Sequence, residues 1–289
     1  MTGDHEYQSL NALISLLDDP DEKAFTAISE QILNIGQEAI PALEKAWENS
    51  FNLLVQSRIE AIIKKIQQDQ LRFEFGNWVT LGSSDLLKGF VLVSRTQYPD
   101  LNEEDIILRM EQIRMDAWLE LNDNLTALEN VRVLNHILFD HNHFDGNKVH
   151  VTAPQNFYVN TILDTHKGSP LTLGMLYQII ARKLNLPIFG VNLPQHFILA
   201  YLMEPLQTNP SEEDVLFYIN PFNKGTVFTR REIELFIHQM KIKMDPSYFT
   251  PCTHIDIIRR WLQTMIQVYS RMGYPDKIGI LENLLEATE

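Results

Sequence analysis

The chain has 289 residues, 45% of them hydrophobic and 21% charged, which is typical of globular proteins and enough for one large domain or two modest ones. Its formal net charge of -14 at pH 7 would repel phosphate backbones and anionic lipids, so nucleic acid and membrane surfaces are disfavoured as partners. No apolar run approaches the roughly 20 residues that cross a bilayer.

The single cysteine and the start of the chain bear on the compartment. Cys252 has no second cysteine with which to form an internal disulfide. The opening MTGDHEYQSL lacks the basic and apolar regions of a secretory signal. We therefore expect a cytoplasmic protein. The expected partner, which these two features do not indicate, is a protein or peptide, and the sequence leaves the oligomeric state open.

Residues 1–70 carry apolar side chains at helical spacing, broken by short turns. The first two stripes comprise Leu10, Leu13, Ile14 and Leu17, then Phe25, Ile28, Ile32 and Ile35. Gly36 stands where a helix-ending glycine belongs, and two further helices follow. The paired helices resemble about one and a half HEAT-type repeats, which implies a helical cap with a concave face for protein contacts. An ordinary helical bundle has the same periodicity and remains an alternative.

Residues 71–250 are predicted to form the core of the protein. The aromatic stretch 73–78 is expected to be a connection, and Asn102 is expected to cap a helix. The later runs PIFGVNL, HFILAYL and VLFYINP are short, β-branched and aromatic, which predicts an antiparallel sheet. Thr229 and Glu232 then form a capping box. The fold class is therefore α+β, mostly helical with a small antiparallel sheet.

Residues 251–289 are predicted to form two helices joined at MGYPD. This spacing is similar to a tetratricopeptide-like hairpin, which we expect to pack against the core of the same chain.

Four short motifs lie within residues 125–239. They are F-x-G-N at 144–147, G-x-P-L-T-L at 168–173, G-V-x-L-P-x-H-F at 190–197 and N-P-F-x-x-G at 220–225. Together they resemble the SirB-one family, a branch of the transglutaminase-like superfamily. The resemblance implies a transglutaminase-like (papain-like) core.

The resemblance also implies a site. Active transglutaminase-like enzymes use cysteine, histidine and aspartate or asparagine in that chain order, with the cysteine at a helix N-terminus, where the helix and an imidazolium stabilise the thiolate. His196 and Asn220 match the histidine and the residue that orients it. Ungapped counting places the cysteine at Pro170, and Cys252 comes too late in the chain.

The available hydroxyls are those of Ser169 and Thr172. Ser169, directly before Pro170, is also typical of a helix N-cap, and Thr172 would lie in the first turn of that helix. Two hypotheses follow. The preferred one is a degenerate Cys-His-Asp site in a non-catalytic interaction or regulatory module. The alternative is a hydrolase or acyl-transferase that uses Thr172 or Ser169 with His196 and Asn220. Ser169 and Gln195 are the candidate binding residues.

Two further sequence features concern packing and metals. Gly174, inside the predicted helix, is expected to make room for a crossing strand. The loop DHNHFDGNKVH contains five potential metal ligands: Asp140, His141, His143, Asp145 and His150. Their spacing matches no known metal motif, and 146–147 is typical of a turn, so we expect a solvated loop. No phosphate-binding glycine loop is present, and no cofactor is expected.

Overall fold

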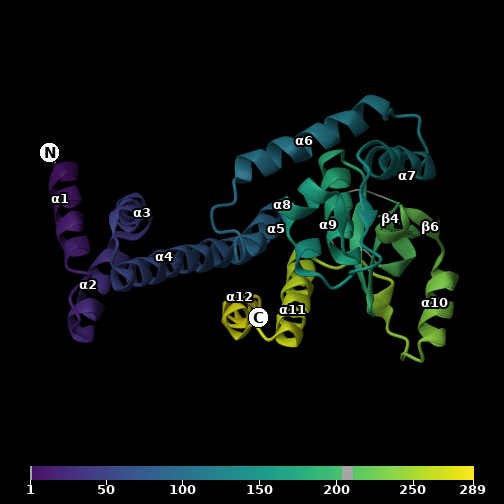
Figure 1. The fold of residues 1–289 in the computed structure, drawn as a ribbon. Coiled ribbons are helices and arrows are strands. Elements are labelled where there is room, and N and C mark those ends of the chain that lie inside the picture. The colour runs from purple at the N-terminus through teal and green to yellow at the C-terminus, as the bar shows by residue number, and fades with distance from the viewer. Residues whose placement is uncertain (1, 204–210) are drawn as a thin grey trace. The chain divides into compact units, whose positions relative to one another are not determined.

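A computed structural model of the chain describes residues 2–203 and 211–289 (Figure 1). It divides into two compact units, residues 1–76 and residues 77–289. The described part of the first unit consists of helices, and the second combines helices with two small sheets.

The helices of the first unit follow the predicted apolar stripes. They are α1 (Thr2–Ser15), α2 (Glu22–Ile35), α3 (Ile40–Asn49) and α4 (Leu53–Thr80). The prediction of a connection at 73–78 is wrong, because α4 runs through it. Leu71, Phe75 and Trp78 are buried at helical spacing, so the two aromatic residues continue the apolar side of one helix.

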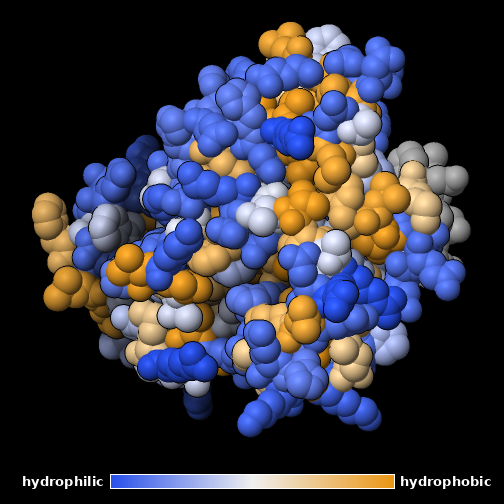
Figure 2. All heavy atoms as spheres, turned by 90° about the vertical axis from the view of Figure 1, so that its right-hand side faces the viewer, coloured by the Kyte–Doolittle hydropathy of each residue, from blue (hydrophilic) through white to orange (hydrophobic). Residues whose placement is uncertain are grey.

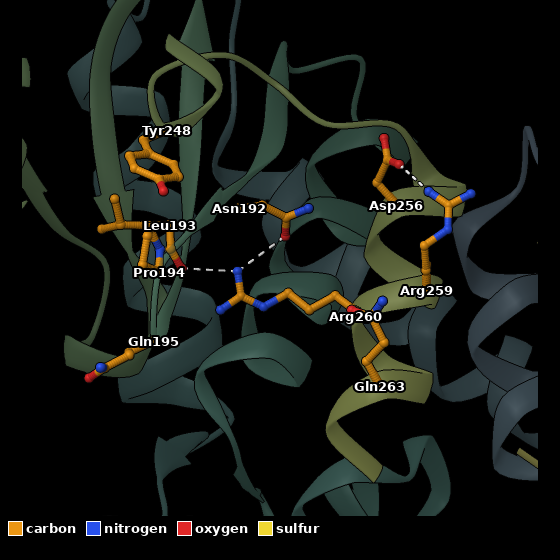
Figure 3. Close-up of a pocket in the computed structure, with 9 residues that line it drawn as sticks. All are labelled: Asn192, Leu193, Pro194, Gln195, Tyr248, Asp256, Arg259, Arg260 and Gln263. Atoms are coloured by element: carbon orange, nitrogen blue, oxygen red, sulfur yellow. Dashed lines mark hydrogen bonds and ion pairs between the residues drawn. The ribbon is translucent and has the colours of Figure 1, made fainter. Parts of the chain in front are cut away.

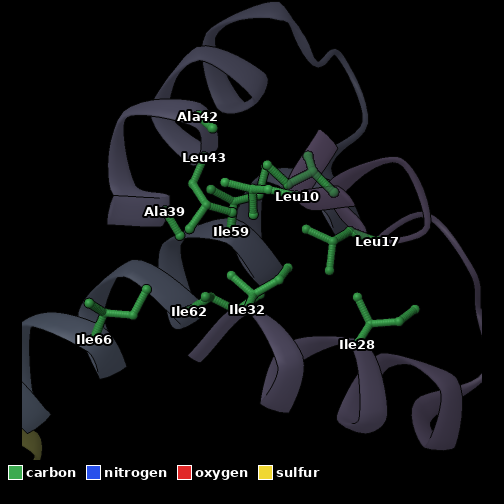
Figure 4. Close-up of a cluster of buried hydrophobic side chains, with 11 residues drawn as sticks. Leu10, Leu17, Ile28, Ile32, Ala39, Ala42, Leu43, Ile59, Ile62 and Ile66 are labelled. Atoms are coloured by element: carbon green, nitrogen blue, oxygen red, sulfur yellow. The ribbon is translucent and has the colours of Figure 1, made fainter. Parts of the chain in front are cut away.

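The apolar stripes of these helices meet in one cluster (Figure 4). Its buried members are Leu10, Ile14, Leu17, Ile28, Ile32, Ala39, Ala42, Leu43, Ile59, Ile62 and Ile66. Helices of 10 to 14 residues, such as α1, α2 and α3, are marginal on their own, so the shared burial of one face from each helix stabilises the unit.

A buried arginine holds the turn between α1 and α2. Arg58 of α4 is 5% exposed and donates hydrogen bonds to the carbonyl oxygens of Leu17 and Asp19. It also donates to the carboxylate of Glu22 over 3.0 Å and lies over the ring of Phe25. The polar turn that the sequence predicted is therefore fixed by a side chain from a distant helix.

The second unit holds the remaining helices. They are α5 (Leu86–Ser94), α6 (Glu103–Glu120), α7 (Ala127–Asn135), α8 (Val159–Thr165), α9 (Pro170–Lys183), α10 (Arg230–Gln239), α11 (His254–Met272) and α12 (Pro275–Glu286). Two predicted caps are confirmed: Asn102 accepts a hydrogen bond from the backbone of Asp105, and Thr229 and Glu232 form a reciprocal box. A π-helical turn, His136–His141, continues α7.

A four-stranded antiparallel sheet lies at the centre of the second unit. Its strands, in spatial order, are β3 (Ile188–Leu193), β4 (His196–Leu202), β5 (Val215–Asn220) and β6 (Thr226–Phe228). The first three were predicted and are confirmed, whereas β6 was not predicted. The mostly helical α+β class is also confirmed.

A second, two-stranded sheet was not predicted. β1 (Asp145–Gly146) pairs in parallel with β2 (Lys167–Gly168). The prediction of a turn at Gly146 is wrong, because Gly146 pairs with Gly168. A Cβ atom on Gly146 would lie 2.5 Å from the ring of Phe222, so the F-x-G-N and N-P-F-x-x-G motifs pack directly on each other.

The two faces of the main sheet are covered by different helices. Phe197 and Leu199 of β4 face α9, at the position of Gly174. The alternate residues Ile198 and Ala200 belong to a cluster with Ile233 and Ile237 of α10. Because side chains alternate along a strand, every residue of β4 is thereby assigned to one face or the other.

The outer surface near α7, β6 and α10 is seen in Figure 2, where hydrophobic side chains run from the top into the middle of the view. Exposed apolar residues of these elements and of β5 are Leu128, Leu216, Val227 and Leu235. Singly exposed apolar residues are ordinary, so they do not by themselves mark a binding site. Within the described ranges, no helix combines the length and apolar character needed to cross a membrane.

Candidate functional site

Helix α9 begins with a reciprocal cap formed by Ser169 and Thr172. The backbone N–H of Thr172 donates to Ser169 Oγ over 3.2 Å, and the backbone N–H of Ser169 donates to Thr172 Oγ1 over 3.0 Å. Thr172 Oγ1 donates its own proton to the carbonyl oxygen of Asn156, 2.7 Å away. Both side chains are buried, and Pro170 occupies the first helical position. The local prediction of a cap is confirmed, and both hydroxyls serve backbone groups.

Two asparagines hold the loop that covers this cap. The side-chain amide of Asn147 donates to Asn156 Oδ1 over 3.0 Å, and its backbone N–H donates to the carbonyl oxygen of Gly168. Asn156 is 1% exposed, and its carbonyl oxygen also accepts from the backbone of Ser169. The sequence drew attention to Asn147 through its motif, but no pattern singled out Asn156.

His196 lies at the first position of β4, directly after the turn that joins it to β3. Its ring packs against that of Phe236 on α10, with the centroids 5.0 Å apart. Partial burial and the positive charge of Arg260 lower the pKa of His196 below its usual value. The imidazole is therefore mainly neutral at neutral pH and faces the α10 side of the sheet.

The next residue, Phe197, occupies the opposite face and fills the space against α9. A Cβ atom on Gly174 would lie 2.4 Å from Phe197 Cδ1, and one on Gly190 would lie 2.5 Å from Phe197 Cζ. The expectation that a strand crosses at Gly174 is confirmed. Hence β4 directs Phe197 and Leu199, and not His196, towards α9.

Asn220 ends β5 and builds the turn that follows. Its Oδ1 accepts a hydrogen bond from the backbone of Asn223 over 3.3 Å, and its carbonyl oxygen accepts from Gly225. Gly225 adopts φ +69°, and a Cβ there would overlap the amide of Asn135. The N-P-F-x-x-G motif is thus explained by a tight turn whose glycine is required by both backbone conformation and space.

Cys252 is distant from the start of α9 in the chain and bonds to the central sheet. Its backbone N–H and its thiol both donate to the carbonyl oxygen of Gly190, over 2.8 and 3.2 Å. Burial raises the pKa of this thiol to about 12. A thiol with so high a pKa is a poor nucleophile at neutral pH.

The structure brings together only some of the predicted site residues. Ser169 and Thr172 contact each other. Among the described residues, no hydrogen bond links either hydroxyl to His196 or joins His196 to Asn220. Gln195 occupies the β3–β4 turn at φ +60°, where it is exposed. In the same described part of the chain, no three carboxylate, imidazole or thiol side chains, including those of the 140–150 loop, converge as metal ligands.

Comparison with known proteins identifies the family. The model of the transglutaminase-like superfamily matches residues 104–263, which include α9 and the strands β3 to β6. The chain belongs to the transglutaminase-like superfamily. The matched region contains Ser169 and Thr172, which cap α9, and the whole main sheet. The transglutaminase-like core predicted from the four motifs is therefore confirmed.

Relatives of this transglutaminase-like chain occur in animals and bacteria. It is 26% identical to human F-box only protein 21 over 153 residues, which are 53% of this chain and 24% of that protein. It is 24% identical to a UPF0162 protein of Xylella fastidiosa over 215 residues, 69% of this chain and 72% of the relative. A UPF0162 protein of Vibrio cholerae is 23% identical over 181 residues, 62% and 64% of the two chains. No solved structure matches the chain.

Proposed function

We propose that the chain is a SirB-one-type member of the superfamily with a degenerate Cys-His-Asp site, and that it acts as a non-catalytic protein-interaction or regulatory module. The start of α9 carries the proposal. The place at which the resemblance puts the cysteine is Pro170, whose side chain has no nucleophile.

The neighbouring hydroxyls do not replace the missing thiol in this proposal. A serine or threonine hydroxyl has a far higher pKa than a thiol and needs a general base within hydrogen-bond reach. Thr172 is fully buried and donates its proton to the carbonyl oxygen of Asn156. Ser169 Oγ is 3.0 Å from Thr172 Oγ1 and accepts the backbone hydrogen bond of the cap. Activating either hydroxyl would break the cap that starts the helix.

The position of His196 supports the same proposal. The imidazole packs on Phe236 of α10, whereas α9 covers the other face of the sheet. A base on one face cannot take a proton from a hydroxyl on the other. The hydrolase or acyl-transferase alternative would therefore require β4 to change its pairing.

An activity assay tests the proposal directly. The purified chain is incubated with an amine donor and a glutamine peptide, and separately with ester and peptide substrates, beside a His196→Ala variant. We expect no turnover above the variant with any substrate. Turnover that His196→Ala abolishes, while the unfolding midpoint stays unchanged, would show that the site is catalytic.

For the interaction role we propose a groove in the first unit as the docking surface. The groove lies between α3 and α4, has a volume of about 530 Å³, and is lined by Glu44, Trp47, Glu48, Glu60, Ile63, Lys64 and Gln67. Trp47 is 38% exposed, and its indole N–H donates to Glu60 over 2.9 Å. An exposed tryptophan beside three glutamates and one lysine favours a basic segment with an apolar side chain as the occupant.

Charge reversal tests this surface. A variant with Glu44, Glu48 and Glu60 each changed to Lys is compared with a control in which Asp18, Glu30 and Glu38, exposed residues of the same unit, are changed to Lys. Both variants change the net charge equally. We expect captured partners to be lost with the groove variant and kept with the control. Equal partner recovery by the two variants would exclude the groove.

The domain scheme is part of this proposal. We infer a HEAT-like cap at 1–70, a transglutaminase-like core at 71–250 and a tetratricopeptide-like hairpin at 251–289, in a protein of the cytoplasm. The support is the set of short helices packed through their apolar stripes, the hairpin of α11 and α12, and the single cysteine.

A further inference from the structure

A pocket of about 400 Å³ lies between the β3–β4 turn and helix α11 (Figure 3). Asn192, Leu193, Pro194 and Gln195 line it from the turn, and Tyr248, Asp256, Arg259, Arg260 and Gln263 complete it. None of its lining residues belongs to the α9 cap or to the groove of the first unit. Its central group is the guanidinium of Arg260, which extends from α11 towards the turn (Figure 3).

Hydrogen bonds within the protein use only one corner of this guanidinium, which also lies over the ring of Phe197, with its carbon 5.8 Å from the ring centre. Nη1 donates to Asn192 Oδ1 over 3.2 Å and to the carbonyl oxygen of Leu193 over 3.0 Å. Both acceptors are neutral. Among the described residues, Nε and Nη2 of Arg260 have no hydrogen-bond acceptor. These two atoms form the edge with which arginine binds a carboxylate through two parallel hydrogen bonds.

The positive charge of Arg260 also lacks a counter-charge within the described part of the chain. The nearby carboxylate of Asp256 accepts from Arg259 over 2.8 Å and from the side chain of Thr253. Arg259 in turn is bound to Thr288. Burial lowers the pKa of Arg260, which reflects the cost of keeping this charge away from water. A half-buried arginine without a carboxylate can gain free energy from an anion that enters the pocket.

The surroundings of the open edge favour a carboxylate attached to an apolar group. In Figure 3, Gln263 lies beside the Arg260 side chain on α11, and Gln195 lies on the turn side with its amide directed away from Arg260. Pro194 and the ring of Tyr248 line the wall on the turn side, where Leu193 contributes the carbonyl oxygen that Arg260 already binds. Gln195 holds φ +60°, a conformation that favours glycine or asparagine in such a turn.

We propose that this pocket binds a carboxylate group, held side-on by Nε and Nη2 of Arg260, with an adjacent apolar side chain against Pro194 and Tyr248. The carboxylate can come from a free organic acid, from the C-terminus of a peptide or from an acidic peptide side chain. All three present the same planar group, and the experiment separates them.

The test follows the Nε–H signal of Arg260 in nitrogen-15 NMR spectra of the full chain, assigned by its loss in Arg260→Lys. The probes are N-acetyl-phenylalanine, its amide, a pentapeptide with a free C-terminal phenylalanine, the same pentapeptide amidated, an amidated peptide with one internal glutamate, and inorganic phosphate. We expect the carboxylate probes to shift the signal in a saturable way, and the amides without carboxylate to leave it unchanged. The probe that binds most tightly identifies the source of the carboxylate.

Two variants complete the design. Arg260→Lys keeps the charge but loses the paired donors, so we expect it to weaken binding roughly tenfold. Arg271→Lys, in the last turn of the same helix and outside the pocket, is the matched control and should bind as the native chain does. An unchanged far-UV spectrum of Arg260→Lys excludes a folding defect. Equal binding of acid and amide, a preference for phosphate, no shift with any probe, or native affinity in Arg260→Lys would each overturn the proposal.

Discussion

Replacement of Gly174 by alanine tests the contact between α9 and β4. In an exposed helix this substitution stabilises by about 1 kcal/mol, because alanine restricts the unfolded chain and favours the helix. At position 174, however, the new Cβ would lie 2.4 Å from Phe197 Cδ1 and 2.6 Å from Phe197 Cε1. The ring cannot withdraw freely, because its far end lies against Gly190, where even an added Cβ would be only 2.5 Å from Phe197 Cζ.

The expected magnitude follows from these opposing effects. Overpacking a filled core costs about 1–3 kcal/mol, which exceeds the gain in helix propensity. We expect Gly174→Ala to lower the free energy of unfolding by about 1 kcal/mol. Gly279→Ala is the matched control, since Gly279 lies inside α12 and a Cβ there would meet no atom within 4 Å. This control should raise the free energy of unfolding by up to about 1 kcal/mol.

Urea unfolding followed by far-UV circular dichroism measures both variants. A double variant, Gly174→Ala with Phe197→Leu, should cost less than the sum of its two single changes, because the smaller side chain removes the clash. If Gly174→Ala stabilised the chain as much as Gly279→Ala, or if the double variant were strictly additive, the ring of Phe197 would not fill the space against α9.

Three further predictions use the same measurements. Thr172→Val should lower the free energy of unfolding by about 1 kcal/mol, because the hydrogen bonds of Thr172 Oγ1 to the carbonyl oxygen of Asn156 and to the N–H of Ser169 are lost, while that N–H and that oxygen stay bonded to each other; a change within error would contradict the cap. The thiol of Cys252, with its pKa raised to about 12, should resist a thiol-specific dye in native buffer and react quickly in urea; rapid native labelling would refute its burial. Burial lowers the pKa of His254 below 6.5, so its contribution to stability is present above pH 6.5 and is lost as the pH falls towards the lower folded value. The urea unfolding midpoint of His254→Gln should therefore fall less on acidification than that of the native chain. An equal fall in both would argue against a lowered pKa of His254.

The sequence predicted those elements whose formation depends on local periodicity. The stripe through Leu10 and Leu17, the strand that holds Phe197 and the cap at Ser169 each have a signal within a few residues. The short strands were not predictable in this way. The pairing of Gly146 with Gly168 joins residues that are far apart in the chain. In addition, a strand of two residues is too short to show an alternation of apolar and polar side chains.

The face of His196 could not be predicted either. The remaining residues of β4, from Phe197 to Leu202, are all buried, so apolar side chains occupy both faces of the strand. A strand of this kind reads as a continuous apolar run and gives no sign of which face meets α9. The contacts of His196 with Phe236 and of Phe197 with Gly174 establish which face of the sheet each side chain occupies.

The pairing of β4 has a consequence for any attempt to restore thiol chemistry. A sulfur atom introduced at position 170 would stand at the start of α9, on one side of the strand layer, while the imidazole of His196 packs on Phe236 on the other. To reunite them, the strand would have to slip by one residue, which would turn Phe197 and Leu199 out of their packing against α9. Recovery of a reactive pair would therefore demand a redesign of the interior and not a single substitution.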